Sequence, residues 1–160
     1  MALKQTTDTN TFLFAWNPIK WPWPEISEAT ELLESGDKYT DTWTCVSHKK
    51  VKPGDRAFFS KVGPVPRGIF ASGKIISEPF IGRSSKKKEA FCVKIEFDTI
   101  LDPSKTDILT LDILNIGQLA KQVWTPQSSG ISIRPEFAEE LELLWEDFLR
   151  TKAAGTAFEL

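Results

Sequence analysis

Residues 90–100 read AFCVKIEFDTI, the clearest secondary-structure pattern in the chain. Apolar residues alternate with more polar ones, Phe91, Val93, Ile95 and Phe97 against Cys92, Lys94, Glu96 and Asp98. Because successive side chains of a strand point to opposite faces, this period of two predicts a β-strand with one buried side. We therefore expect the fold to be built around strands.

Before this strand, shorter apolar segments bounded by turn residues also have the composition of β-strands. Strands are predicted at residues 11–16 (TFLFAW), 56–61 (RAFFSK) and 67–76 (RGIFASGKII). Helical spacing predicts one helix at 25–35 and another at 136–149, whereas 108–119 fits either state. Glycines inside the 67–76 strand are typical of a barrel corner. Without regular alternation of strands and helices, the pattern favours an α+β fold, a small, partly closed β-barrel with flanking helices.

The length and composition fit one globular domain of 160 residues, 41% hydrophobic and 26% charged. We assign residues 1–150 to this domain and residues 151–160, which are mostly small and featureless, to a linker or disordered C-terminal tail. The apolar runs are too short to cross a bilayer, and the N-terminal MALKQTTDTNTF lacks a signal-peptide pattern. A cytoplasmic location with no membrane partner is expected.

Several enzyme classes lose their usual signals. One His and two Cys cannot supply the ligand sets of common zinc sites, so no metal is expected. The sequence also lacks G-x-x-x-x-G-K-[ST], G-x-G-x-x-G and G-x-S-x-G, the motifs of phosphate-binding loops, dinucleotide sites and nucleophile elbows. We expect a binding domain without cofactor or catalytic residues rather than an enzyme.

The net charge of −2 conceals a basic middle segment. Residues 47–105 hold 13 Lys or Arg against 6 Asp or Glu, a balance of +7, and the remainder holds 7 against 16, a balance of −9. Such a segment suits a polyanion, because phosphate binding releases counterions, although it equally fits a solvated surface. Candidate contacts to a nucleic-acid backbone are Lys49, Lys50, Arg67, Arg83, Lys86, Lys87 and Lys88, with Gln127, Ser128 and Ser129 from a hydroxyl-rich loop.

Three tryptophans lie where they could form the walls of a slot. Trp21 and Trp23 belong to the proline-stiffened segment WPWP, and Trp43 follows in a polar stretch. Flat side chains on stiff loops can stack an unpaired base, although any single Trp fits a core position equally well. The polar groups nearest to these walls are Asn17, Thr44 and Ser47, which could read a base edge or make local turn bonds. These six residues form the predicted base pocket.

Four stretches in this order resemble one known family. They are 11–23 (TFLFAWNPIKWPW), 41–63 (DTWTCVSHKKVKPGDRAFFSKVG), 67–80 (RGIFASGKIISEPF) and 123–133 (VWTPQSSGISI), the last one before LELLW at 141–145. Over residues 11–145 the chain resembles the EVE domain, a PUA-like module related to the ASCH and YTH domains. The similarity is closest to the EVE-like domains at the N-terminal end of HNH-type, modification-dependent restriction endonucleases.

The resemblance implies a small twisted barrel whose aromatic cleft receives a modified cytosine, 5-methylcytosine or 5-hydroxymethylcytosine, flipped out of double-stranded DNA. Trp43 matches the tryptophan that forms a pocket wall in EVE and YTH domains, and Thr44 matches the small polar position beside it. Stand-alone EVE proteins have W-D-G-V-R-N where residues 43–48 here read WTCVSH. Any nuclease activity would belong to a separate, C-terminal HNH-type domain of a longer parent chain.

Three other functions remain open on the sequence alone. An RNA-binding PUA-like module would use the same aromatic residues and lysines. An enzyme acting on a nucleotide or small molecule would need an acid–base pair, which the sequence does not identify. A protein-interaction domain could use the outward face of the last helix, which bears Glu139, Glu140, Glu142 and Glu146.

Overall fold

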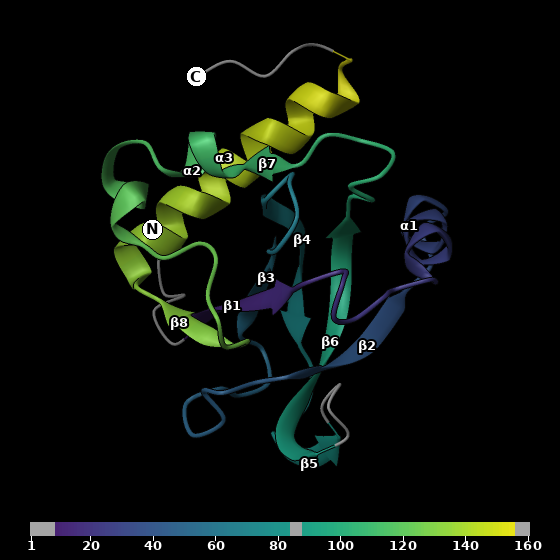
Figure 1. The fold of residues 1–160 in the computed structure, drawn as a ribbon, viewed down its shortest axis with the longest axis vertical. Helices are drawn as coiled ribbons and strands as arrows, with labels where there is room; N and C mark the ends of the chain where they lie inside the picture. The colour runs from purple at the N-terminus through teal and green to yellow at the C-terminus, as the bar shows by residue number, and fades with distance from the viewer. Residues whose placement is uncertain (1–8, 84–87, 156–160) are drawn as a thin grey trace.

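The structure is a computed structural model that describes residues 9–83 and 88–155. It confirms the predicted α+β fold (Figure 1). The elements in chain order are β1 (Thr11–Trp16), α1 (Ile26–Glu34), β2 (Tyr39–Thr44), β3 (Arg56–Lys61), β4 (Gly68–Ile75), β5 (Phe80–Arg83), β6 (Glu89–Ile100), β7 (Leu109–Thr110), α2 (Leu111–Leu114), the 3₁₀ helix η2 (Gly117–Lys121), β8 (Ile131–Ile133) and α3 (Pro135–Ala153).

The strands form one curved sheet in the order β2-β6-β4-β3-β1-β8, with β5 paired to β6 and β7 paired to β4. Strands β1 and β3 run parallel, and the other pairs are antiparallel. The ladder is open between β2 and β8, but the residues that flank these strands meet. The amide of Val46 donates to the Ser129 carbonyl at 2.8 Å, and that of Ser47 donates to the Gly130 carbonyl at 3.3 Å. We call these two bonds the seam, which brings the two ends of the sheet together.

Two hydrophobic clusters lie on opposite faces of the sheet, and they explain why β1 is buried and largely apolar along its whole length. In β1, Phe12, Phe14 and Trp16 point into one cluster and Leu13 points into the other. The first cluster lies inside the curve of the sheet, where rings from strands that are not neighbours meet: Phe59 of β3 lies 4.9 Å from Trp43 of β2. The second is covered by α3. A strand buried on both faces needs no alternation of apolar and polar residues.

The helices lie on different sides of the strands, α1 at one edge and α3 with α2 on the other side (Figure 1). Helix α1 contributes Ile26 and Ala29 to the first cluster. Helix α3 contributes Leu141, Trp145 and three other buried residues to the second. None of the helices that the structure describes is long and apolar enough to span a membrane.

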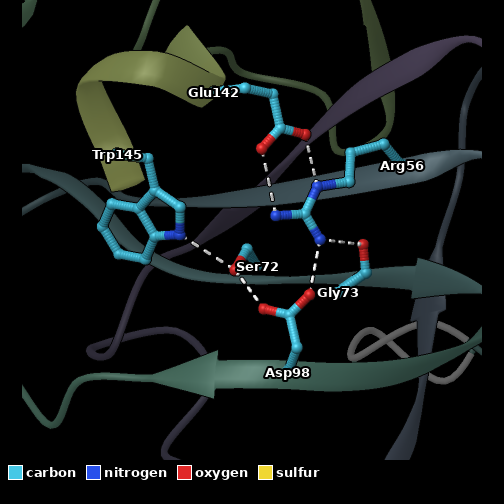
Figure 2. A network of polar contacts seen from close by, with 6 residues as sticks. All are labelled: Arg56, Ser72, Gly73, Asp98, Glu142 and Trp145. Carbon is cyan, nitrogen blue, oxygen red and sulfur yellow. Dashed lines mark hydrogen bonds and ion pairs between the residues drawn. The ribbon is translucent and has the colours of Figure 1, made fainter. Parts of the chain in front are cut away.

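A polar network joins α3 to the sheet (Figure 2). The Arg56 guanidinium on β3 donates to both carboxylate oxygens of Glu142 on α3, at 2.6 and 3.3 Å, and to Asp98 on β6 at 2.5 Å. The Ser72 hydroxyl donates to Asp98 at 2.5 Å and accepts from the Trp145 indole at 3.0 Å. The buried indole N–H therefore has a partner, and the ion pairs hold α3 in place.

The structure corrects or completes the predictions at four places. The polar segment that holds Trp43 is the strand β2, and the ambiguous residues 108–119 contain β7, α2 and the start of η2. At the start of β6, Phe91 is 38% exposed and Cys92 only 1%. There β6 pairs with β5, and Phe91 lies outside both hydrophobic clusters, with the His48 ring stacked on it at 3.7 Å between ring centres.

The fourth difference is the end of α3, which includes residues 151–153 of the predicted tail. The Thr151 hydroxyl donates to the Asp147 carbonyl at 2.9 Å, and the Lys152 ammonium lies 5.7 Å from the centre of the Phe148 ring. These contacts extend the helix by one turn. The division of the chain into a domain and a tail otherwise stays a prediction.

Candidate functional site

One cavity of about 290 Å³ opens beside the barrel, and we call it the tryptophan cavity. Its lining comes from five parts of the chain: the end of β1, the loop that follows it, β2, the β5–β6 hairpin and the loop before β8. The lining residues are Ala15, Trp16, Trp21, Pro22, Trp23, Glu25, Asp41, Thr42, Trp43, Thr44, Arg83, Cys92 and Ser129.

Strand β2 supplies one wall of the tryptophan cavity. Tyr39, Asp41 and Trp43 are two residues apart, so they share one face of the strand. The Trp43 ring packs on Phe59, with ring centres 4.9 Å apart, and on Trp23, with ring centres 5.7 Å apart. Its indole N–H is buried and has no hydrogen-bond partner in the described structure. Packing rather than hydrogen bonding therefore holds Trp43.

The WPWP loop supplies the facing wall, and local contacts keep it rigid. The Trp16 indole donates to the Trp21 carbonyl at 2.7 Å, and the Trp21 amide donates to the Asn17 carbonyl at 2.9 Å. Trp23 lies edge-on to Trp16, and its indole donates to the Tyr39 hydroxyl at 3.3 Å. The prolines, which cannot donate to a ladder, keep this segment out of the sheet. The walls are formed before any ligand binds.

Acidic groups line part of the tryptophan cavity. Burial raises the pKa of Asp41; the Thr42 amide and the Tyr39 hydroxyl oppose this shift, and the charge of Glu25 adds to it. Burial likewise raises the pKa of Tyr39 to about 12. At neutral pH Tyr39 therefore keeps its proton and donates to Asp41, with an O–O distance of 3.3 Å.

Of the six predicted pocket residues, Trp21, Trp23, Trp43 and Thr44 line the tryptophan cavity. Asn17 and Ser47 are outside the lining and make local turns instead. The Asn17 side-chain oxygen accepts from the Ile19 amide at 3.0 Å. The Ser47 carbonyl accepts from the amides three and four residues later, Lys50 at 2.9 Å and Val51 at 3.1 Å. Both residues stabilise the loops that border the cavity.

The residues that were predicted to contact a nucleic-acid backbone divide into three groups. Arg83 and Ser129 line the tryptophan cavity, and the Ser129 hydroxyl accepts from the Ala15 amide at 3.1 Å. Lys49, Lys50, Gln127 and Ser128 are exposed on the two loops that the seam joins. Arg67, which is exposed, donates to the Gly63 carbonyl in the β3–β4 loop, and Lys88 is exposed before β6. Lys86 and Lys87 lie outside the described residues.

Two cations of the basic middle segment are engaged in contacts within the domain. Arg56 is paired with Glu142 and Asp98 on the side of α3. Lys61 is buried, and its ammonium donates to the carbonyls of Pro64 and Pro66 at 2.7 and 2.9 Å. These two cations serve the fold, so the charge available near the tryptophan cavity is smaller than the sequence balance indicates.

Sequence reasoning missed Glu25, Asp41 and Cys92 in the lining. Acidic residues in a polar stretch look like surface positions, and Cys92 lies on the face of β6 that was expected to be polar. The spacing of Asp41 to Trp43 would have placed both on one face if β2 had been recognised as a strand. Among the residues that the structure describes, no group of three or more His, Cys, Asp or Glu side chains could hold a metal ion.

Several solved structures share this architecture at low sequence identity. A hypothetical protein from Leishmania major superposes with a TM-score of 0.62 at 14% identity, covering 89% of this chain and 98% of that one. Human THYN1 in complex with 5-methylcytosine-containing DNA gives 0.60 at 17% identity, covering 86% and 98%. The Mmi1 YTH domain in complex with RNA gives 0.53 at 11% identity, covering 90% and 82%.

The chain has the PUA-like fold of EVE and YTH domains. This confirms the fold that the sequence resemblance implied. No protein-family model and no curated protein matches the sequence. The PUA-like fold therefore rests on the arrangement of strands and helices, because identities of 11–17% leave few shared residues.

Proposed function

We propose that this domain reads modified DNA by receiving a flipped 5-methylcytosine or 5-hydroxymethylcytosine in the tryptophan cavity. The observation that carries the proposal is the cavity itself, about 290 Å³ in volume and walled by Trp21, Trp23 and Trp43. An extruded base offers two flat faces and polar edges. The cavity offers indole planes together with carboxylate, hydroxyl and guanidinium groups.

The energies of flipping and stacking are compatible with this role. Extruding a base costs a few kcal/mol. Stacking on aromatic side chains returns about 1–3 kcal/mol per base, and phosphate contacts by cations add affinity that is independent of sequence. Since the indoles are held by one another and by the barrel core, little entropy is lost in ordering them on binding. Lys49, Lys50 and Arg83 would hold the backbone beside the cavity.

The comparison structures support a nucleic-acid partner. THYN1, with the same fold, was solved with DNA that contains 5-methylcytosine. In this proposal the chain up to the end of α3 at Ala153 forms a binding domain without catalytic residues, acting in the cytoplasm, and the residues after α3 link it to the rest of a parent chain. The resemblance to EVE-like domains of HNH-type endonucleases supports a targeting role in prokaryotic defence, with cleavage by a separate nuclease domain.

RNA is the second candidate partner. The observation that favours it is the fold shared with the Mmi1 YTH domain, which was solved with RNA. An aromatic cavity can stack a base from either nucleic acid. Competition between a methylated duplex and single-stranded RNA of equal length separates the two, because the preferred polymer displaces the other at lower concentration.

Titration against matched duplexes tests the proposed modification. The duplexes carry cytosine, 5-methylcytosine, 5-hydroxymethylcytosine or N6-methyladenine at one position, and fluorescence anisotropy reports the dissociation constants. Burial of one methyl group is worth about 0.8 kcal/mol, so 5-methylcytosine should bind about four-fold more tightly than cytosine. Equal dissociation constants for all four duplexes would contradict a modified-base reader.

The exposed lysines next to the seam should set affinity without setting preference. In Lys49→Ala/Lys50→Ala, each lost phosphate contact should lower the slope of log K against log salt by about 0.9. The ratio of affinities for methylated and unmethylated DNA should stay unchanged. Lys74→Ala/Lys121→Ala is the matched control, because both lysines are exposed and outside the cavity lining. A slope equal to that of the unmodified protein would show that Lys49 and Lys50 do not touch the backbone.

A further inference from the structure

We propose that Asp41 selects the base by accepting a hydrogen bond from its exocyclic amino group, so that the tryptophan cavity takes cytosine rather than thymine. This inference rests on the proposed function and names the residue that decides between the two pyrimidines. Asp41 was not part of the pocket predicted from the sequence, and its place in the lining comes from β2.

The position of Asp41 is suited to reading a base edge. It lies between Tyr39 and Trp43 on the same face of β2, and in the sheet it pairs with Ile95 of the neighbouring strand β6. A base stacked against Trp43 would therefore present its edge to a neighbouring side chain of a strand rather than to a loop. Side chains on strands hold their geometry better than side chains on loops.

The hydrogen bonds of Asp41 leave room for a ligand. One carboxylate oxygen accepts from the Thr42 amide at 2.8 Å, and the other accepts from the Tyr39 hydroxyl at 3.3 Å. An ionised carboxylate offers about four acceptor sites, so these donors occupy about half of them. Both donors are neutral. A further donor would find an acceptor that already lines the tryptophan cavity.

The cost of burying Asp41 points to the same kind of ligand. Burial raises the pKa of this carboxyl, and the nearby charge of Glu25 adds to the shift. The two hydrogen bonds therefore compensate only part of the lost hydration. An amino group of a base would supply a donor where the carboxylate lacks one. A carbonyl at the same place would instead face two carboxylates and be repelled.

Cytosine and thymine differ in the polar group that would face Asp41. Cytosine carries an amino group at C4, a hydrogen-bond donor, whereas thymine carries a carbonyl oxygen at C4, an acceptor. 5-Methylcytosine and thymine share the methyl group at C5, so stacking and methyl burial are closely similar for the two. The difference in their affinities therefore reports the polar edge of the base, the group at C4 together with N3, which is an acceptor in cytosine and a donor in thymine.

The test uses two duplexes that differ only in that polar edge. One carries 5-methylcytosine and the other thymine, each opposite an abasic site, so that neither loses a base pair when it is extruded. A good polar contact to a base edge discriminates by about 1–3 kcal/mol, which corresponds to about 5–150-fold in dissociation constant in favour of 5-methylcytosine. In Asp41→Asn the amide can turn either its oxygen or its N–H₂ to the base. The preference should then fall to within about two-fold.

Two controls separate folding from recognition. Asp107→Asn, at an exposed position outside the lining, should keep the full preference. Asp41→Asn is close to isosteric, and an unchanged thermal midpoint confirms that the variant is folded. If folded Asp41→Asn keeps the original preference, or if the original protein binds both duplexes equally, Asp41 does not read the amino group.

The proposed function fails on a different result. It is refuted if the original protein binds fully paired duplexes with cytosine, 5-methylcytosine and 5-hydroxymethylcytosine equally, whatever Asp41→Asn does. An Asp41→Asn variant that still prefers 5-methylcytosine over cytosine would support the reader function even if Asp41 does not read the amino group.

An aromatic cavity with carboxylates also suits an organic cation. Displacement of the duplex by a trimethyl-lysine peptide would overturn both proposals.

Discussion

Trp43→Ala is expected to erase the preference for methylated over unmethylated duplex. The indole of Trp43 is both a wall of the tryptophan cavity and the ring that packs on Phe59 and Trp23. Its removal takes away the stacking surface, worth about 1–3 kcal/mol, or about 5–150-fold in affinity for an extruded base. Contacts to the phosphates remain, so the variant should bind both duplexes with the weak affinity of non-specific DNA. Anisotropy titrations of the two duplexes measure the ratio.

In Trp43→Ala, a loss of protein stability must be distinguished from the loss of the cavity wall that Trp43 forms. Truncating a large aromatic side chain in a packed region costs about 3–5 kcal/mol. Leu141→Ala is the control, because Leu141 is fully buried in the second cluster under α3 and its truncation costs about 2–5 kcal/mol. That variant should be destabilised yet keep the preference for methylated DNA. A Trp43→Ala protein that is folded and still distinguishes the two duplexes would remove Trp43 from the site.

Gly130→Ala is expected to destabilise the protein far more than Gly36→Ala. Both glycines have positive φ, +88° and +87°, so both substitutions carry about 1–2 kcal/mol of backbone strain. A Cβ at Gly36 would meet nothing within 4 Å, whereas at Gly130 it would lie 2.7 Å from the Cα and Sγ of Cys45. Overpacking adds about 1–3 kcal/mol, so Gly130→Ala should lose about 2–5 kcal/mol in all.

The difference between the two variants measures how tightly the seam is closed. Gly130 accepts from the Ser47 amide and donates to the Leu13 carbonyl, so pushing it away from Cys45 opens the barrel between β2 and β8. Urea unfolding gives both free energies of unfolding under the same conditions. Gly130→Ala should also weaken binding of methylated DNA, because Ser129 lines the tryptophan cavity. Equal losses of stability in the two variants would show that the loops can separate freely.

Much of the fold could be predicted because the spacing of apolar residues along a short segment indicates whether it forms a strand or a helix. Strands β1 and β3 coincide with the predicted segments, and helices α1 and α3 follow the predicted apolar spacing within a few residues. Strand β2 was missed because YTDTWT is polar on its outward face and only half-buried on the other. These residues form a strand because they pair with β6, and the sequence of the hexapeptide does not indicate that pairing.

The candidate site divides in the same way. Trp21 and Trp23 could be assigned to a stiff loop from the prolines around them. Trp43 could be assigned to the pocket from its polar neighbours, but the structure places it on the strand β2. Asn17 carries an amide side chain of the kind that can read a base edge, but its side-chain oxygen accepts a hydrogen bond from the Ile19 amide in a local turn. Asp41 looked like one more surface charge, because the sequence does not reveal which face of β2 meets the WPWP loop.

The sequence by itself determined the segments of β1, β3, β4 and β6, the rigid aromatic loop and the absence of common catalytic motifs, since these depend on residues a few positions apart. Only the tertiary structure decided which charged groups face the tryptophan cavity. Arg56 and Lys61 pair with groups from their surroundings, while Asp41, Glu25 and Arg83, far apart along the chain, converge on one hollow. The physical reason is the curvature of the sheet, which closes at the seam and brings distant segments together.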